Sequence, residues 1–80
     1  MAQFEFLGRL SERFAPQMQL AIPSDIDTIA GLRPWLNTQL DCDHFSQPTI
    51  RAIVNGQITA EDGAISDCDT IAFYPPVGGG

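Results

Sequence analysis

The chain has 80 residues, a net charge of −6 at neutral pH and a hydrophobic content of 44%. A chain of this length forms one domain with a modest core, because it buries only about 60–65% of its unfolded surface. The negative charge disfavours nucleic acid and anionic membranes as partners and favours a basic protein surface. Acidity that only keeps the domain soluble would give the same charge.

Segments that direct a chain to a membrane are not visible in the sequence. No apolar run is long enough for a transmembrane helix. The N-terminus, Met1–Glu5, lacks the basic region followed by an apolar region that marks a signal peptide. We therefore expect a cytoplasmic protein.

The basic residues and the cysteines restrict the function further. All four basic residues are arginines, so a modifier that builds chains on itself would find an acceptor amine only at the N-terminus. This composition argues against a protein tag and is compatible with a carrier. Cys42 and Cys68 form no Cys-x-x-Cys pair, so we expect two reduced, structural thiols, although the sequence leaves a disulfide open.

The chain begins with a predicted strand. Residues 4–7 alternate so that Phe4 and Phe6 face the core and Leu7 lies on the outer face. A single exposed leucine usually has no function. Leu7 becomes a candidate binding residue only if it lies beside Tyr74.

A helical turn and a second strand follow. Residues 11–15 predict a short turn closed by Pro16, with Phe14 at one edge of the core. Residues 17–22 alternate again and end at Pro23, which cannot continue a ladder. The residues that should face inward in this strand are Met18, Leu20 and Ile22. Together the two strands predict a hairpin with a broad connection.

One long helix is predicted next. Ser24 with Asp27 resembles a capping box, and Thr28 is an alternative N-cap. Pro34 falls on the face opposite the apolar stripe and should kink or thin the helix near residues 30–33. The stripe, which we interpret as core, consists of Ile29, Leu32, Leu36 and Leu40, joined by Ile26 if the helix begins early.

The segment after the helix contains four residues that can bind metals. Asp41, Cys42, Asp43 and His44 are consecutive. Neighbouring loop residues rarely converge on one ion, and no further ligands occur at suitable spacing, so we predict a solvated loop and no metal site. His44 is the only histidine, and no nucleophile pattern lies near it.

Three short strands complete the domain. Residues 49–54 predict a strand, Asn55-Gly56 a type I′ turn, and residues 57–59 the returning strand. A loop over residues 60–66 follows, with Ile65 expected beneath it. Residues 67–69 then turn into the last strand, residues 70–74. Alternation in that strand places Ile71 and Phe73 inward, and Ala72 and Tyr74 outward beside Leu7.

The chain ends in Pro75-Pro76-Val77-Gly78-Gly79-Gly80. The prolines cannot donate to a sheet and carry the chain stiffly away from the domain. Glycines add no fold stability at this place, because they lose the most conformational freedom on ordering. The alternatives are a frayed terminus, an artificial linker, or a thin peptide that presents its carboxylate to another protein's active site.

The tail and the strand before it resemble the C-terminus of the molybdopterin synthase small subunit, a ubiquitin-like sulfur-carrier family. That family ends in Asp-Gly-Asp, a short strand containing Ala-Phe, then Pro-Pro-Val, a variable residue and Gly-Gly. Gly78 fills the variable place here, and length and element order also agree. Cys68 departs from the pattern, because it stands where the family has glycine and would be strained if that turn needs a positive φ.

The resemblance implies an α+β fold of the ubiquitin-like β-grasp type, with a mixed sheet of about five strands on one main helix. The first and last strands would pair in parallel at the centre of the sheet. Residues 1–74 would form this domain, and residues 75–80 would form an extended C-terminal Gly-Gly tail.

The resemblance also implies chemistry at Gly80. A ubiquitin-activating-like adenylyltransferase would use ATP to adenylate its carboxylate, and sulfur would displace AMP to leave a thiocarboxylate. The sulfur would pass to cyclic pyranopterin monophosphate in molybdenum cofactor biosynthesis. The large subunit would supply the catalytic side chains, in a heterotetramer of two small and two large subunits. The small subunit itself would bind no cofactor and contact neither nucleic acid nor membrane.

Within this scheme each tail residue has a role. Gly79 and Gly80 would keep the channel and the acyl carbon free of side chains. Pro75 and Pro76 would reduce the entropy lost when the tail threads, with Val77 and Gly78 completing the threaded segment. Leu7 and Tyr74 are the predicted partner interface, and incidental exposure is the alternative explanation for them.

Other functions remain open. The chain could carry sulfur in a thiamine-type pathway, serve as a β-grasp interaction module without catalysis, or act as a ubiquitin-like tag. Nothing in residues 1–74 pairs a nucleophile with a base or forms a phosphate-binding loop. We therefore expect the chemistry at the C-terminus, with partners supplying the catalysis.

Overall fold

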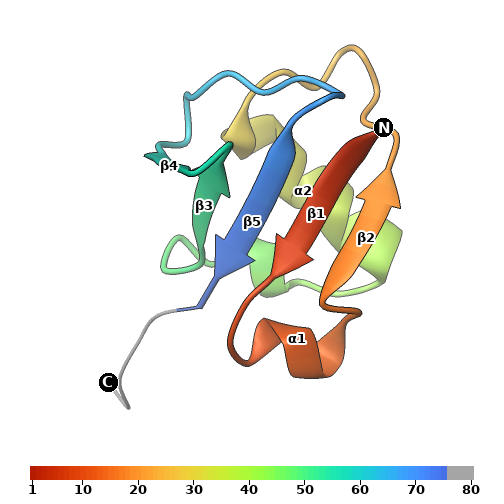
Figure 1. The fold of residues 1–80 in the computed structure, drawn as a ribbon, viewed down its shortest axis with the longest axis vertical. Coiled ribbons are helices and arrows are strands. Elements are labelled where there is room, and N and C mark those ends of the chain that lie inside the picture. The colour runs from red at the N-terminus through yellow and green to blue at the C-terminus, as the bar shows by residue number, and fades with distance from the viewer. Residues whose placement is uncertain (76–80) are drawn as a thin grey trace.

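A five-stranded sheet crossed on one face by a single long helix makes up the body of the chain (Figure 1). The computed structural model describes residues 1–75. In chain order the elements are β1 (Ala2–Phe6), α1 (Leu10–Arg13), β2 (Gln17–Leu20), α2 (Ile29–Leu40), the 3₁₀ helix η1 (His44–Ser46), β3 (Arg51–Val54), β4 (Gln57–Thr59) and β5 (Thr70–Tyr74). Among the described residues, no helix is both long and apolar enough to span a membrane.

The strand order is β2-β1-β5-β3-β4. β1 and β5 are parallel, with Phe4 beside Ile71 and Phe6 beside Phe73. The other neighbouring strands pair antiparallel. The first and last strands therefore lie together in the sheet, and the predicted β-grasp fold is confirmed.

The core lies between the sheet and α2. Ile29, Leu32 and Leu36 are fully buried, as the helical stripe predicts, whereas Leu40 at the end of the helix is only partly buried. They meet the inward side chains of the central strands, which are Phe4, Phe6, Ile71 and Phe73. Each buried side chain of this size contributes about 1.5–3 kcal/mol through removal of apolar surface from water.

Thr28 caps α2, as one of the two sequence alternatives predicts. Its Oγ1 accepts a hydrogen bond from the Gly31 N–H at 3.2 Å. Pro34 is exposed on the opposite face, and the helix continues through it as far as Leu40. Asp41 then ends the helix in the left-handed conformation, with φ of 52°.

Three strands differ in their bounds from the sequence prediction, among them β3, which begins at Arg51 instead of residue 49. β1 begins at Ala2 and ends at Phe6, so Leu7 lies just beyond the strand, although its N–H still donates to the Phe73 carbonyl at 3.0 Å. β2 ends at Leu20 instead of residue 22. The Ile22 N–H donates to the Asp67 carboxylate at 2.6 Å, which takes this donor out of the strand ladder.

Asn55 and Gly56 form the predicted tight turn between β3 and β4. Both have positive φ, 51° and 85°, as a type I′ turn requires. After β4 the chain crosses the end of the sheet, and Ile65 is buried beneath this loop as expected.

The turn before β5 differs from the expectation for Cys68. Within residues 1–75 the non-glycine residues with positive φ are Asp41 and Asn55, so Cys68 carries no strain of this kind. Side chains hold the turn instead. The Asp69 carboxylate accepts bonds from the Ser66 N–H at 2.8 Å and from the Asn55 amide at 3.1 Å. The Asn55 bond is the main reason that the pKa of Asp69 is lowered.

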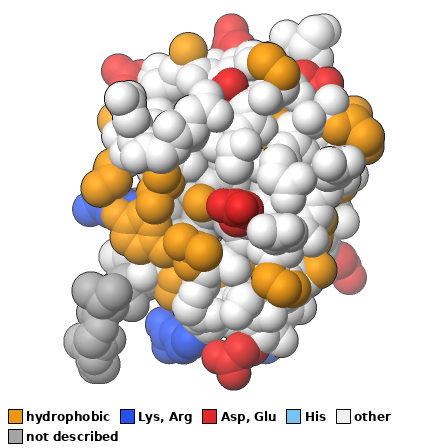
Figure 2. Space-filling view, in the orientation of Figure 1, with side chains coloured by type: hydrophobic (Ala, Val, Ile, Leu, Met, Phe, Trp, Pro, Cys, Tyr) orange, Lys and Arg blue, Asp and Glu red, His pale blue; other side chains and the backbone are white. Residues whose placement is uncertain are grey.

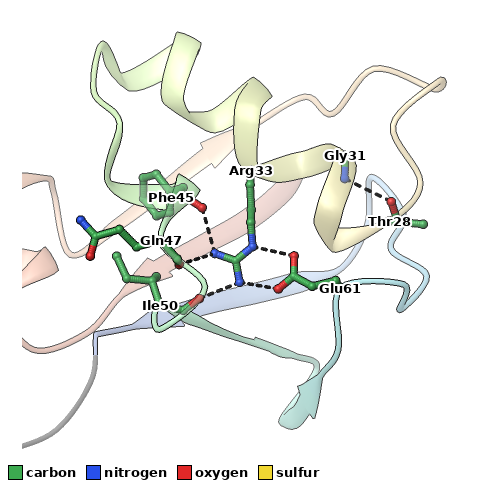
Figure 3. Close-up of polar contacts among 7 residues, drawn as sticks. All are labelled: Thr28, Gly31, Arg33, Phe45, Gln47, Ile50 and Glu61. Carbon is green, nitrogen blue, oxygen red and sulfur yellow. Dashed lines mark hydrogen bonds and ion pairs between the residues drawn. The ribbon is translucent and has the colours of Figure 1, made fainter.

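Arg33 joins α2 to two loops (Figure 3). Its Nε and Nη2 donate to the two Glu61 carboxylate oxygens at 2.8 and 2.7 Å. Its remaining bonds go to the main-chain carbonyls of Phe45, Gln47 and Ile50, at 2.6–3.2 Å. Because a buried guanidinium must fill its donors to be tolerated, this network fixes the segment between η1 and β3. Sequence reasoning missed this role, since an arginine within an amphipathic helix predicts exposure.

Candidate functional site

The candidate site begins where β5 ends, at the root of the tail. Pro75 is the last described residue and is partly buried. The predicted reactive residue, Gly80, and the predicted tail residues Pro76, Val77, Gly78 and Gly79 lie outside the described residues. Their assigned roles therefore stay predictions.

Gly8 packs directly against the root of the tail. A side-chain Cβ at this position would lie 3.3 Å from Cγ of Pro75, and the backbone φ is +57°. Both features favour glycine, the first for space and the second for conformation. The close approach places the β1–α1 connection, from Leu7 to Arg9, against the base of the tail.

Leu7 and Tyr74 lie at the same end of the central strand pair. The parallel register pairs Phe6 with Phe73, and Leu7 and Tyr74 are the residues that follow this last registered pair. Leu7 is 42% exposed, and Tyr74 is partly buried at the end of β5. The structure thus places both residues of the predicted interface at the end of the sheet from which the tail departs. Binding by them remains a prediction.

Two further apolar residues lie on the open face, the sheet face that α2 does not cover, and were missed by sequence reasoning. Ile53 in β3 pairs with Ile58 in β4, and also with Ala72 in β5. Ile58 is 74% exposed, the largest exposed fraction among the described large hydrophobic residues. Figure 2 shows hydrophobic side chains gathered on this side of the face, over β3, β4 and β5. The sequence could have revealed this pair, because Ile53 and Ile58 lie at equal distances from the Asn55-Gly56 turn and therefore face each other in a hairpin.

Ala72 was expected to point outward from the last strand, and it does so without being exposed. Its side chain is outside the core cluster, as alternation predicts, but it is only 7% exposed. Ala72 lies in a central strand between Glu5 and Ile53, and these longer neighbours cover it. We define the open apolar patch as Leu7, Ile53, Ile58, Ala72 and Tyr74.

The rest of the open face is polar. Side-chain hydrogen bonds link β2 to β1 there. Nε2 of Gln17 donates to Oε2 of Glu5 at 3.4 Å, and Nε2 of Gln19 donates to Oε1 of Gln3 at 3.3 Å. Arg51 is exposed beside Tyr74 in the β3–β5 register. The face therefore has an apolar half next to the tail and a hydrogen-bonded half away from it.

Residues 1–75 contain no group of three or more His, Cys, Asp or Glu side chains placed to hold a metal ion. His44 contacts Arg13 instead, with 3.0 Å between Nε2 and Nη2. Both cysteines are free thiols, Cys42 partly buried and Cys68 exposed. Ser66 Oγ lies 3.2 Å from the Cys68 sulfur.

Solved structures that resemble this chain include proteins from Pyrococcus furiosus and Haloferax volcanii. A Pyrococcus furiosus protein assigned as molybdopterin converting factor subunit 1 matches with a TM-score of 0.74 and 15% identity, covering 95% of this chain and 97% of the other. Small archaeal modifier protein 1 from Haloferax volcanii matches with a TM-score of 0.74 and 19% identity, covering 95% of this chain and 97% of the other. The Haloferax volcanii HVO 2177 protein matches with a TM-score of 0.75 and 18% identity, covering 99% of this chain and 85% of the other. At these identities the likeness concerns the fold alone.

The family comparison is more specific. No curated protein sequence matches the chain significantly. The ThiS family profile, however, matches residues 4–80, which includes α2, the glycine tail and all of the sheet except the first two residues of β1. The match agrees with the parallel β1–β5 pair and with the single long helix. The chain therefore belongs to the ThiS family and has the β-grasp fold of ubiquitin-like sulfur carriers.

Proposed function

We propose that the chain is the sulfur-carrying small subunit of a molybdopterin synthase. The observation that carries this proposal is the order of features at the end of the chain. Pro-Pro-Val-Gly-Gly-Gly directly follows a central strand, and an apolar patch without a partner lies beside the point of departure. A carrier needs both features, since one delivers the reactive end and the other binds the enzyme that receives it.

The reactive group is the Gly80 carboxylate. Its oxygen attacks the α-phosphorus of ATP within an activating adenylyltransferase, and pyrophosphate leaves. A donor at the sulfide oxidation level then attacks the acyl carbon, and AMP leaves, so no net oxidation occurs. The product is a thiocarboxylate, whose sulfur is passed to cyclic pyranopterin monophosphate within the large subunit. ATP belongs to the activating partner, and this chain contributes the acyl group alone.

The tail sequence suits this use. Glycine at residues 79 and 80 leaves the acyl carbon open to attack, because no Cβ stands beside the reacting atoms. Pro75 and Pro76 restrict the unbound chain, so less conformational entropy is lost when the tail enters a channel. Gly8 supports the same role from the body, since its positive φ of +57° favours glycine and a Cβ there would crowd Pro75 at 3.3 Å from its Cγ.

The open apolar patch is the proposed docking surface for the large subunit, in an assembly of two small and two large subunits. Apolar and aromatic side chains supply most of the binding energy of protein interfaces. Tyr74 offers a large ring beside the tail, and Ile58 offers the most exposed aliphatic group. Docking at this patch would hold the body while the tail reaches the active site.

Sulfur loading tests the proposal. The full chain is incubated with the activating enzyme of the same host, ATP and a sulfide source, and its intact mass is measured. We expect a gain equal to the replacement of one oxygen by sulfur. A chain lacking Gly80 should gain nothing, while its melting temperature stays unchanged. Full sulfur loading of the chain without Gly80 would refute the proposal.

A second candidate is attachment to other proteins, which the structural likeness to small archaeal modifier protein 1 brings forward. The absence of lysine removes side-chain amines on which this chain could be extended, but it does not affect attachment to a different protein. Proteomic detection of the Gly80 carboxylate in amide linkage to lysines of other proteins would favour this function. A thiamine-type sulfur pathway would instead be recognised by which acceptor takes the sulfur.

A further inference from the structure

A pocket of about 430 Å³ lies at the root of the tail, and none of the residues of the open apolar patch line it. We call it the arginine pocket. Its wall includes Arg9, Arg13, His44, Gln47, Ile50 and Pro75. Pro75 belongs to this wall and also contacts Gly8, so a protein that engages the tail passes this pocket.

Helical geometry brings the two arginines together. Arg9 has helical dihedral angles at the start of α1, and Arg13 ends the same helix. Residues four apart on a helix share a face. Leu10, which is 4% exposed, anchors α1 to the core and so fixes which way that face points. The result is two guanidinium groups on one wall, an arrangement that repels itself unless an anion lies between them.

His44 and Arg33 support the opposite wall. Nη2 of Arg13 lies 3.0 Å from Nε2 of His44, a contact that joins α1 to η1. Arg33 holds the carbonyls of Gln47 and Ile50 and thereby sets the segment that completes the pocket. The pocket is therefore a built feature of the fold.

No described carboxylate neutralises this charge. Within residues 1–75 the ion pairs are Met1 with Asp67 and Arg33 with Glu61. Acidic residues on the adjoining elements, which are Glu12, Asp41 and Asp43, are exposed and make no ion pair there. On a chain of net charge −6, two of its four arginines thus form a local cationic site.

We propose that the arginine pocket binds a side-chain carboxylate of the activating enzyme as that enzyme admits the tail. This inference rests on the proposed function. The partner surface should be basic overall to complement the acidic chain, and one acidic residue upon it would find two positive charges together at the arginine pocket. Such a reversed charge pair helps to fix the register of docking, because most other placements of that residue would set like charges together.

A free anion is a poorer occupant. Both arginines are exposed, so a diffusing carboxylate or phosphate competes with water for them and binds weakly. A carboxylate held on a docked protein arrives at high effective concentration and is partly shielded from water when the interface closes. The pocket therefore suits a group presented by a partner.

Initial rates of sulfur loading test the inference, with intact mass as the readout and chain concentration as the variable. The variant Arg9→Gln/Arg13→Gln removes two positive charges. The control Ala21→Glu/Ser24→Glu lowers the net charge equally at exposed positions near the opposite end of the sheet. The conservative variant Arg9→Lys/Arg13→Lys keeps the charge. Melting temperatures verify that each variant folds.

At low ionic strength we expect the glutamine variant to raise KM about tenfold with little change in kcat, as the loss of a steering and register contact predicts. Added salt should narrow its difference from the wild type. The lysine variant should restore most of the loss, and the control should change KM about twofold at most, an effect typical of net charge.

A glutamine variant that loads as efficiently as the control would overturn the pocket assignment and leave the proposed function standing. A loss that salt does not reduce would also overturn it, because the arginines would then act through the fold. If the wild type takes up no sulfur from its host's activating enzyme, the proposed function fails, and this inference fails with it.

Discussion

The two faces of the sheet use similar apolar residues for opposite purposes. On the covered face, Phe73 is fully buried against α2, as is Leu36 on the helix itself, and burial of this kind stabilises the fold. On the open face, Leu7 and Ile58 are 42% and 74% exposed and contribute little to folding. The comparison teaches that position relative to α2, and not residue type, separates stability from binding. Substitutions on one face should change unfolding, and substitutions on the other should change partner binding.

The comparison extends to the arginines. Arg33 uses all its donors on groups of its own chain, while Arg9 and Arg13 lie exposed at a pocket. Arg33 is therefore occupied by hydrogen bonds within its own chain, whereas Arg9 and Arg13 remain available to a partner. Figure 3 shows the first arrangement, in which the Arg33 guanidinium is surrounded by oxygen acceptors.

The largest effect on folding should come from the covered face. Leu36→Ala leaves a cavity in a fully buried site and should lower the free energy of unfolding by about 2–5 kcal/mol. The matched open-face change, Ile58→Ala, should stay within about 0.5 kcal/mol of the wild type. Urea unfolding measures both. Equal losses at the two positions would break the comparison.

Arg33→Ala should be the next most damaging. It leaves three main-chain carbonyls and Glu61 without their donor, and we expect a loss of about 2–3 kcal/mol. The control Arg9→Ala, at an exposed position, should cost less than about 0.5 kcal/mol. Thermal unfolding followed by circular dichroism distinguishes them. A stable Arg33→Ala protein would show that the loop segment holds without its anchor.

Charge on the open apolar patch should weaken docking. Leu7→Asp or Tyr74→Asp should each reduce affinity for the large subunit about tenfold or more, equivalent to about 1.4 kcal/mol or more. Gln19→Asp, in the polar half of the same face, should bind like the wild type. Titration calorimetry gives the affinities. Unchanged binding by both patch variants would make their exposure incidental.

The smallest effect concerns acid. The Ile22 N–H bond lowers the pKa of Asp67, and the Asn55 amide does the same for Asp69. A depressed folded-state pKa stabilises the fold above the ordinary carboxyl pKa of about 3.9, and that contribution disappears as the pH falls through the folded-state value. The melting temperature should therefore fall more steeply below about pH 4 in the wild type than in Asp67→Asn, which keeps an acceptor oxygen but does not titrate. If the melting temperatures of the two proteins fell equally with pH, the stabilising role of the Asp67 carboxylate would be contradicted.

The fold could be predicted because local and global signals agree. The Asn55-Gly56 turn, the Thr28 cap, and the stripe beginning at Ile29 each have a local cause that the structure preserves. Predicted boundaries failed where a distant group intervened, as when the Asp67 carboxylate takes the Ile22 N–H. That contact joins residues 45 positions apart, and no local pattern reveals it.

The candidate site was predicted less completely. Leu7 and Tyr74 could be paired once the first and last strands were placed together, but the full apolar patch also needs the register of β3 and β4. The arginine pocket could not be foreseen, because His44 and Arg13 are 31 residues apart and meet only through the tertiary fold. Surfaces built from several elements depend on packing, whereas the tail signature is contiguous in the sequence.

The most direct measurement of the central claim is the intact mass of the protein isolated from its own host under conditions that preserve thiocarboxylates. We predict a population in which sulfur replaces one oxygen at Gly80, located by fragmentation to the C-terminal residue. A population with only oxygen at that terminus, in cells actively making molybdenum cofactor, would contradict the account. So would a natural chain that continues beyond Gly80, because its glycines could not then present a terminal acyl group.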